Sequence, residues 1–568
     1  MLKTFLLAGL SALVFSGCST TAISSANSDN GISPEGRLYA DYLVGSYADF
    51  LGDAEARSKH YSQAYVQARH DIVLGRRAMT SALRAGDPDL ARTLARTVNS
   101  VDVSEPVSRA ILGAYEFSNG HYDRAMRYFD QPTPDFTVRI LINLMKGWAE
   151  AERGNPDEAR IAFSSIDGGS YFDSLGALQI YILEARYGDM ETALEGFSMA
   201  QDSGVAVIET ALAHTRALVK SGDRTGAMHF IANFNTENGP FETGPVARMI
   251  GDLGDGAIIQ TDLRAQVLAA RAITESAVGF FVYNRAPDVA EVFLQIALDL
   301  DPDHDKARLR LGSLLENSDR DREAVALYKT IPESSPYIVP ARLSEANIYF
   351  GRNEDEKALA VLEATNTGHP SFVTRESLGR ARLIRENYKE ALPLYDALVR
   401  SMSGEELKAN PEPLYFRGIC YERTEQWEKA VVDFKKVLEI NPDNADALNY
   451  LGYTWVDRGE NLEEAFHMIK RAVELEPDSG AITDSLGWAY YRLGQYQKAR
   501  EYLEKAVELS PSNATIIDHL GDVYRKLGRY REARYQWERA LEFEPTEKEE
   551  KAIKQKLGGG LSLVDSGP

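Results

Sequence analysis

The chain has 568 residues, of which 44% are apolar, so it can bury a large core and global disorder is excluded. It carries 85 acidic and 63 basic residues, which gives a net charge of −22 at pH 7. A surface this acidic repels nucleic acid and offers no general attraction to anionic lipid, so we expect no nucleic-acid partner.

The first eighteen residues predict a leader sequence. Lys3 is a minimal basic region, residues 4–15 form an apolar core too short to span a bilayer, and small residues then precede Cys18. The segment resembles a bacterial lipoprotein signal, and the resemblance implies cleavage after residue 17, acylation of Cys18 and, because Ser19 follows, the outer membrane. An ordinary secretory leader that is cut elsewhere remains the alternative.

The cysteine content agrees with this interpretation. With Cys18 acylated, Cys420 is the only thiol left, so no intramolecular disulfide can form. We expect Cys420 to be a buried, inert thiol in a helix rather than a nucleophile.

A regular spacing of glycines begins after a predicted flexible tether at residues 18–35, which is rich in Ser, Thr, Asn and Gly. The glycines recur every 34 residues, and an alanine follows five residues after each of them except the first. They are Gly52, Gly86, Gly120, Gly154, Gly188 and Gly222. A period of this length predicts stacked helical hairpins that bury one another rather than a single globular core.

One repeat near the C-terminus shows how each unit should fold. Two short stretches have apolar residues at helical spacing. Gly521 and Ala533 are small where the two helices must approach closely, Gly528 can adopt a left-handed turn, and Pro545 ends the unit. The pattern predicts a helix, a tight turn and a second helix.

The preceding repeat has Leu486, Gly487, Tyr490, Ala499, Leu503, Ala506 and Pro511 in signature places. This pattern resembles the tetratricopeptide repeat. The resemblance implies an all-α fold, a right-handed α-solenoid of about fourteen helix-turn-helix units whose first helices line a concave face.

Breaks in the repeat pattern suggest the domain organisation. The predicted segments are a signal peptide (1–17), the tether (18–35), an N-terminal degenerate block (36–236), an irregular Gly/Pro linker or loop (237–262), a middle block (263–400), a C-terminal block (411–545), and a capping helix with a loose tail (546–568).

The sequence contains only incomplete versions of known catalytic and metal-binding motifs. The stretch 301–305 imitates the start of a calcium loop, but Lys306 and Gly312 replace the Gly and Glu that such a loop requires. Nine histidines show no paired zinc spacing. Ser485 and His519 lie at equivalent places of adjacent repeats, yet Ser485 is expected in mid-helix without an oxyanion hole. We therefore expect no catalysis, cofactor, metal or small-molecule substrate.

The candidate functional residues lie on the first helices of the last repeats. Places five, nine and twelve of each first helix share one stripe because they are spaced i, i+4 and i+7. With a neighbouring histidine they form a candidate protein-binding groove, here called the candidate groove: Asn449, Tyr453, Asp484, Trp488, Tyr491, Asp518, His519, Asp522 and Arg525. Packing between neighbouring repeats is the alternative role for these residues.

Two features of these stripes need explanation. Asp518 and Asp522 are like charges one turn apart, and Arg492, Arg525 or a bound partner could neutralise them. Trp148 falls on an equivalent stripe far upstream. The rigid aromatic residues of the candidate groove are of the kind that anchor interfaces.

The last four repeats also resemble a group of proteobacterial tetratricopeptide lipoproteins, through the successions 449–453, 484–488 and 518–522. The resemblance implies a scaffold or adaptor anchored in the outer membrane through Cys18, with its array in the periplasm. Its partners would be periplasmic or outer-membrane proteins, among them a periplasmic processing protease or a cell-wall hydrolase. The alternative is a structural component of a surface-polysaccharide or protein export or assembly machine.

Overall fold

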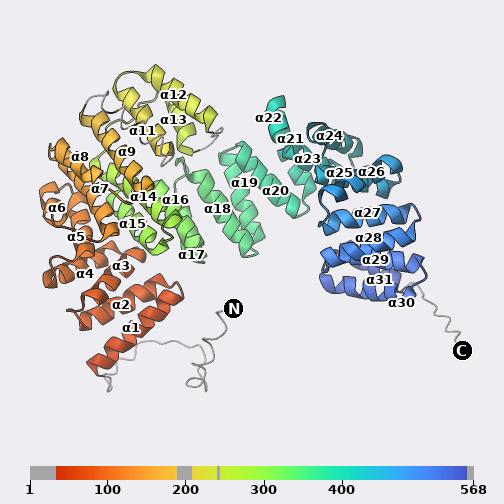
Figure 1. Cartoon of the computed structure of the whole chain (residues 1–568), viewed down its shortest axis with the longest axis horizontal. Helices are drawn as coiled ribbons and strands as arrows, with labels where there is room; N and C mark the ends of the chain where they lie inside the picture. Colours follow the sequence, from red (N-terminus) through yellow and green to blue (C-terminus); the bar gives the residue numbers. More distant parts are fainter. Residues whose placement is uncertain (1–32, 189–192, 194–196, 198–206, 239–243, 559–568) are drawn as a thin grey trace. The chain divides into compact units, whose positions relative to one another are not determined.

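The computed structural model describes residues 33–188, 193, 197, 207–238 and 244–558. Cys18, the predicted leader and most of the predicted tether lie outside these residues. Every element formed by the described residues is a helix, which confirms the predicted all-helical solenoid (Figure 1).

The chain divides into two compact units. The first comprises the chain up to Tyr337 apart from residues 241–244, and the second comprises Ile338 onwards. The helices of the first unit are α1 (Pro34–Phe50), α2 (Ala54–Gln67), α3 (Ile72–Arg84), α4 (Pro88–Val101), α5 (Pro106–Ser118), α6 (Tyr122–Phe129), α7 (Phe136–Glu152), α8 (Pro156–Ser164), α9 (Ser170–Tyr187), α11 (Val207–Lys220), α12 (Arg224–Glu237), α13 (Gly244–Gly254), α14 (Ala265–Val282), α15 (Pro287–Leu300), α16 (Asp305–Glu316) and α17 (Asp321–Lys329).

The second unit continues the pattern of paired helices. Its helices are α18 (Ile338–Gly351), α19 (Asp355–Gly368), α20 (Phe372–Ile384), α21 (Tyr388–Ser401), α22 (Gly404–Ala409), α23 (Glu412–Arg423), α24 (Trp427–Ile440), α25 (Ala445–Arg458), α26 (Leu462–Leu475), α27 (Gly480–Arg492), α28 (Tyr496–Leu509), α29 (Ala514–Lys526), α30 (Tyr530–Ala540), the short 3₁₀ helix η1 (Leu541–Phe543) and α31 (Glu547–Gly558). The short helix α22 falls in the predicted break between residues 400 and 411.

The boundary between the two units does not coincide with the irregular segment predicted at 237–262. That segment contains the helix α13, and both α13 and the helices that follow it up to α17 belong to the first unit. The Gly- and Pro-rich composition therefore marks a departure from the 34-residue period without marking the end of a compact unit.

The repeated glycines end the first helix of their hairpins, as the spacing predicted. Gly52, Gly86, Gly120, Gly154 and Gly222 have φ between +72° and +91°, the left-handed region that favours glycine. At Gly188 the backbone is extended, with φ of −102°.

Glycines inside the first helices allow a large side chain of the second helix to approach closely. A Cβ built on Gly521 would lie 2.5 Å from the Trp537 indole, and one built on Gly147 would lie 2.3 Å from the Phe163 ring. Trp537 and Phe163 are both fully buried. Each hairpin therefore closes on an aromatic or aliphatic side chain that the facing glycine accommodates.

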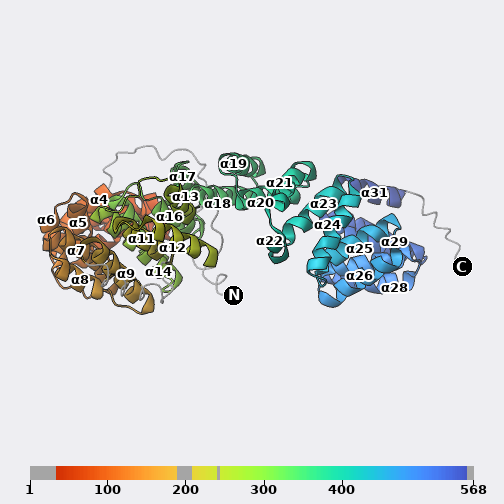
Figure 2. The same cartoon turned by 90° about the horizontal axis from the view of Figure 1, so that it is seen from above.

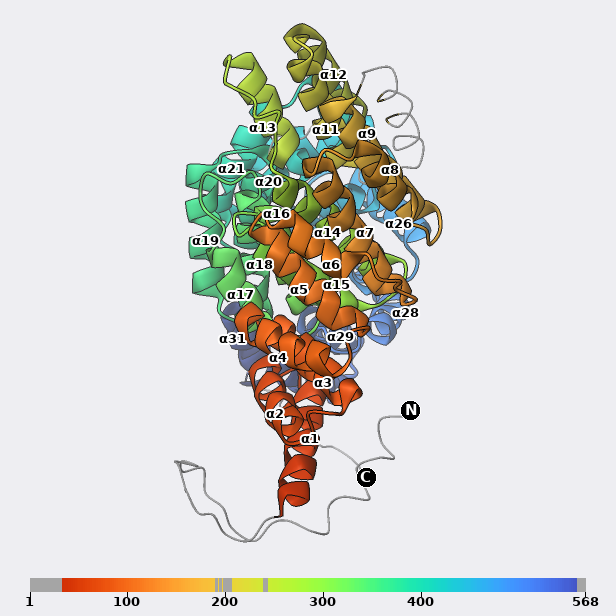
Figure 3. The same ribbon diagram turned by 90° about the vertical axis from the view of Figure 1, so that its left-hand side faces the viewer.

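The first unit has a second layer of helices inside its array. α14 and α15 pack against α3, α5, α7 and α9, the first helices of the N-terminal hairpins (Figure 3). Phe280 on α14 contacts the rings of Phe136 and Phe172, and Gln266 donates a hydrogen bond of 3.1 Å to the carbonyl of Phe117. The chain itself thus covers the inner side of its N-terminal hairpins.

α14 is apolar enough to be considered as a membrane span. It has 18 residues and a mean hydropathy of 1.2, but 72% of them are buried inside the fold. Of the helices in the described parts of the chain, it alone has this length and hydropathy. Its burial is that of a core helix.

Candidate functional site

The candidate groove lies on α25, α27 and α29, which are stacked in chain order in the second unit (Figure 1). Figure 2 shows α25 and α29 from above. Each of these helices begins in the same way. The side chains of Asn444, Ser479 and Asn513 accept a hydrogen bond from the backbone N–H three residues later, which is a typical N-cap. Because all three helices start at equivalent positions, their stripes stay in register.

An aromatic stack forms the centre of the candidate groove. The Trp488 indole stacks on the Tyr491 ring, with centroids 4.6 Å apart, and on the His519 imidazole, with centroids 4.1 Å apart. The planes are within 12° and 19° of parallel. The structure therefore brings together three of the predicted groove residues from two neighbouring repeats.

His519 is held by an acidic partner. It is 8% exposed, and its Nδ1 lies 3.0 Å from both carboxylate oxygens of Asp484. Burial by itself lowers the pKa of the imidazole. The negative charge and hydrogen bond of Asp484, with smaller contributions from Asp518 and Asp522, outweigh burial and raise the pKa of His519 above its ordinary value.

We therefore expect the second unit to lose stability as the pH rises from about 6.5 through the raised pKa of His519. A group whose pKa is higher in the folded state contributes its stabilisation below the unfolded pKa and loses it above the folded one. Urea unfolding of the second unit at several pH values measures this dependence. H519Q should flatten it, whereas H467Q, at an exposed position on α26, should not. A pH dependence that H519Q leaves unchanged would show that His519 is not its source.

The acidic pair Asp518 and Asp522 shares one cation, the Lys556 ammonium on α31. The Lys556 ammonium donates hydrogen bonds of 2.7 and 2.8 Å to Asp518 and of 2.7 Å to Asp522. Sequence reasoning missed this residue, although Lys556 follows Asp522 by 34 residues, one repeat period. α31 therefore stands where the first helix of a further repeat would lie, and it supplies the cation.

The arginines proposed as partners of that pair lie elsewhere, so that part of the prediction was wrong. Arg492 donates to the carbonyl and carboxylate of Asp457. The Arg525 guanidinium lies over the Trp537 ring, 6.0 Å from its centroid. Neither arginine has an ion pair with Asp518 or Asp522 in the structure, and Lys556 takes that place.

The third predicted stripe contributes Asn449 and Tyr453, on α25. Burial raises the pKa of the Tyr453 phenol, and the nearby charge of Asp484 raises it further. Within the described part of the chain, Asn449 Oδ1 and Trp488 Nε1 are buried without a hydrogen-bond partner. An unsatisfied acceptor and an unsatisfied donor beneath the candidate groove have a free-energy cost.

Ser485 does not act with His519. Its hydroxyl donates to the carbonyl of Ala481 in its own helix, at 3.1 Å, while His519 contacts Asp484. Ser485 is therefore engaged in a hydrogen bond that is common for serine inside a helix.

The upstream tryptophan has a different role from the one its position suggested. Trp148 is fully buried, its ring packs against Phe163, and its Nε1 donates a hydrogen bond of 3.1 Å to Gln179. Because α14 covers α7, on which it lies, Trp148 is a core residue.

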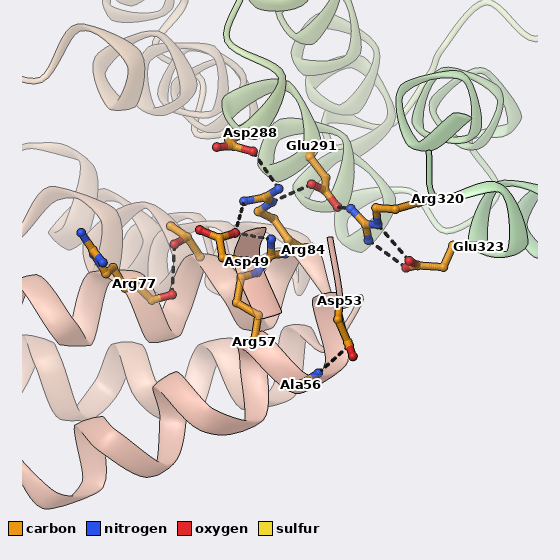
Figure 4. Close-up of polar contacts among 11 residues, drawn as sticks. Asp49, Asp53, Ala56, Arg57, Arg77, Arg84, Asp288, Glu291, Arg320 and Glu323 are labelled. Atoms are coloured by element: carbon orange, nitrogen blue, oxygen red, sulfur yellow. Dashed lines mark hydrogen bonds and ion pairs between the residues drawn. The ribbon is translucent and has the colours of Figure 1, made fainter. Parts of the chain in front are cut away.

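Ion pairs join the inner helices of the first unit to its N-terminal hairpins (Figure 4). Arg84 on α3 contacts Asp288 at 2.7 Å and Glu291 at 2.6 Å, both on α15. Glu291, only 1% exposed, also accepts a hydrogen bond of 2.5 Å from Arg320, which pairs with Glu323. The inner side of these hairpins is thus closed by apolar contacts and by buried charge pairs.

The remaining candidate groups are the Cys420 thiol and the side chains that could bind a metal ion. Cys420 is fully buried, and burial raises the pKa of its thiol to about 12, as expected of an inert cysteine. Across the described ranges, no three His, Cys, Asp or Glu side chains are grouped so that they could hold a metal ion.

Comparison with known proteins supports the repeat assignment. Family models described as tetratricopeptide repeat match residues 411–444, 484–513 and 514–547. The TPR repeat-containing protein PA4667 of Pseudomonas aeruginosa is 29% identical over 202 residues, which are 35% of this chain and 33% of that protein. The peroxisomal targeting signal receptor of Komagataella phaffii is 25% identical over 169 residues, 29% of each chain. The chain therefore spans a third or less of the length of these relatives.

Two solved structures have a related arrangement of helices. A tetratricopeptide repeat protein from Parabacteroides merdae is similar over 51% of this chain and 97% of that chain, with 18% identity and a TM-score of 0.35. The APC/C hetero-tetramer Cut9-Hcn1 is similar over 93% of this chain and 98% of that chain, with 14% identity and a TM-score of 0.36. The helical hairpins and the matched repeat models together identify the chain as an all-helical solenoid that contains tetratricopeptide repeats.

Proposed function

We propose that the chain is a non-catalytic scaffold or adaptor that binds envelope proteins through the candidate groove of its second unit. The observation that carries the proposal is the stack of Tyr491, Trp488 and His519 beside two unsatisfied polar atoms, on Asn449 and Trp488. Partly exposed Trp and Tyr side chains with rigid neighbours are the residues that most often dominate binding energy at protein interfaces.

The charge of the groove narrows the class of partner. Asp484 pairs with His519, and the carboxylates of Asp518 and Asp522 share the single ammonium of Lys556, so this part of the candidate groove keeps an excess of negative charge. A carboxyl terminus is therefore a poor ligand, since it would meet negative charge. We infer that the partner offers an apolar or basic segment that packs on Trp488.

The location is part of the proposal. Cys18, in the leader that lies outside the described residues, would carry the lipid that anchors the chain in the outer membrane, with the array in the periplasm. The partner would be a periplasmic or outer-membrane protein, and a processing protease or a cell-wall hydrolase is the finer expectation. If Cys18 is the anchor, C18S should move the chain from the membrane fraction to the soluble fraction of the cell.

A photoreactive residue placed at Trp488 tests the groove. We expect covalent adducts with an envelope protein, identified by mass spectrometry, because the side chain lies at the centre of the stack. The matched control is Val432, which is 67% exposed on α24, the second helix of its hairpin.

The outcomes distinguish two claims, that the candidate groove binds a protein and that this protein is a protease or a hydrolase. Adducts at Trp488 and not at Val432, lost when D484N is added, support binding through the groove. Equal adducts at both positions, or none at Trp488, would rule it out. A specific partner that is neither a protease nor a hydrolase would leave the scaffold in place and overturn its finer assignment.

A further inference from the structure

The first unit contains a buried group of charges in which, across the described ranges, two arginines form no ion pair. Lys306, on α16, pairs with Glu209 on α11 at 2.8 Å and with Glu275 on α14 at 2.5 Å. Arg216 on α11 and Arg271 on α14 line the same cavity as Glu209. Lys306 thus occupies both carboxylates as an ion-pair partner, and neither arginine forms an ion pair with them.

In the part of the chain that the structure describes, the two arginines are not hydrogen-bonded, although the negative charge of Glu209 acts on both. Within the described residues, neither Arg216 nor Arg271 has a hydrogen bond or an ion pair, whereas the neighbouring Arg186 bonds Glu152 at 2.9 Å. Burial, followed by the positive charge of Arg271, lowers the pKa of Arg216 to about 10. A partly buried guanidinium group normally has an anionic or carbonyl partner, so an anion is the missing component here.

A cavity of about 320 Å³ lies beside these arginines, between α11, α13, α14 and α16. Its lining includes Arg248 and His304 as well as Arg216 and Arg271. His304 is 8% exposed and its Nε2 has no hydrogen-bond partner among the described residues. Burial and the charge of Arg271 lower the pKa of His304 to about 3, so the imidazole is neutral near pH 7 and can donate one hydrogen bond.

The rest of the cavity wall is mixed. Leu212, Met249, Ile258 and Leu263 supply its apolar part, and Asp252 and Gln260 add polar groups. A cavity of this size is at the lower end of the range for small-ligand sites. The occupant should therefore carry one anionic group and a short apolar body.

The larger cavity of the first unit offers a useful contrast. It measures about 470 Å³, lies between α15 and the N-terminal hairpins, and is also lined by arginines. There Arg57 contacts Asp49 at 2.8 Å, and Arg84 contacts Asp288 and Glu291. Arg57 and Arg84 each have a carboxylate partner there, so the same reasoning does not assign an anion to this cavity, although, among the described residues, Nε and Nη2 of Arg57 are buried without a hydrogen bond.

We propose that the cavity between α11, α13, α14 and α16 binds a small organic oxyanion, a carboxylate or a phosphate monoester on a short apolar body, through Arg216, Arg271 and His304. A planar guanidinium group can donate two parallel hydrogen bonds to such an oxyanion. This site is independent of the candidate groove and implies binding without turnover.

Hexanoate and hexyl phosphate are the probes, with hexanol and sodium chloride at equal ionic strength as controls. Calorimetry on the purified chain gives the affinity, and amide hydrogen exchange of α11 and α14 locates the effect. We expect at least one of the two anions to bind and to slow exchange there, and their relative affinities decide between carboxylate and phosphate.

R216Q should weaken binding about tenfold or more, because it removes a charge-assisted contact. The control is R264Q. Arg264 is exposed and directly precedes α14, so its replacement should leave the affinity unchanged.

The same variant separates ligand binding from a structural role. If Arg216 is uncompensated, R216Q should be at least as stable as the unaltered chain in the absence of probe. A strong loss of stability in R216Q would show that Arg216 has a structural partner and would overturn the proposal. Equal stabilisation by hexanol, or undiminished binding in both R216Q and R271Q, would overturn it as well. R271Q repeats the test from α14 if R216Q does not fold.

Discussion

Replacing Glu291 with glutamine should lower the free energy of unfolding of the first unit by about 3 kcal/mol, the lower end of the range for breaking a buried ion pair. Glu291 is 1% exposed and accepts hydrogen bonds from both Arg84 and Arg320 (Figure 4). Glutamine keeps the volume but leaves two guanidinium groups with less negative charge. The effect should not reach the upper end of the range, because Asp288 and Glu323 remain beside those arginines.

The matched control for this substitution is E323Q. Glu323 pairs with the same Arg320, but its side chain is 48% exposed, so its loss should cost about 0.2–1 kcal/mol. Hydrogen exchange of α15 peptides across a urea series reports on the first unit alone. Equal effects of E291Q and E323Q would mean that burial of the pair does not determine its contribution.

Replacing Gly147 with alanine should destabilise the same unit by about 1–3 kcal/mol, although alanine is normally the better helix former. The added Cβ would lie 2.3 Å from the fully buried Phe163 ring, so the hairpin of α7 and α8 would have to open. Gly251 is the matched control, since it also lies inside a helix, α13, and a Cβ there meets no atom within 4 Å.

The two substitutions should therefore have opposite signs. G251A is expected to raise stability by up to about 1 kcal/mol, the helix-propensity difference between glycine and alanine. Urea unfolding with exchange read at α8 and at α13 measures both. A G147A chain as stable as the unaltered one would show that the glycine is not required by the approach of Phe163.

Much of the local fold could be predicted from the sequence because each repeat encodes its own hairpin. The period of 34 residues placed the left-handed turns at Gly52 and its equivalents, and the small residue at Gly521 anticipated the approach of Trp537. These are contacts between residues less than one repeat apart, which spacing alone can specify.

Packing between distant segments could not be predicted in this way. The period contains no information on where α14 and α15 lie, and they cover hairpins that precede them by several repeats. A signal was nevertheless present, because residues 265–282 have a mean hydropathy of 1.2 with Arg271 and Glu275 as their only charged residues, which is typical of a helix buried on more than one face. Trp148 was misassigned to an open stripe for the same reason, since α14 covers it.

In the candidate groove, too, the sequence predicted the local positions but not every contact. Its stripe positions follow from helical geometry, and the structure brings Asp484, Trp488 and His519 together as the spacing required. The role of Lys556 needed the period to be extended beyond the last recognisable repeat. Whether the groove binds a protein stays a prediction that the crosslinking experiment addresses.

The ion pair between Arg84 and Glu291 joins residues 207 positions apart, which has a consequence for biogenesis. A repeat array in which every contact is local can fold as it emerges, hairpin by hairpin. Here α3 is synthesised about 10–40 s before its partner on α15 at ordinary rates of translation, and α5 and α7 somewhat less. During that interval the inner apolar surface of these helices has no cover, so we expect the first unit to complete its fold only after α15 has been made.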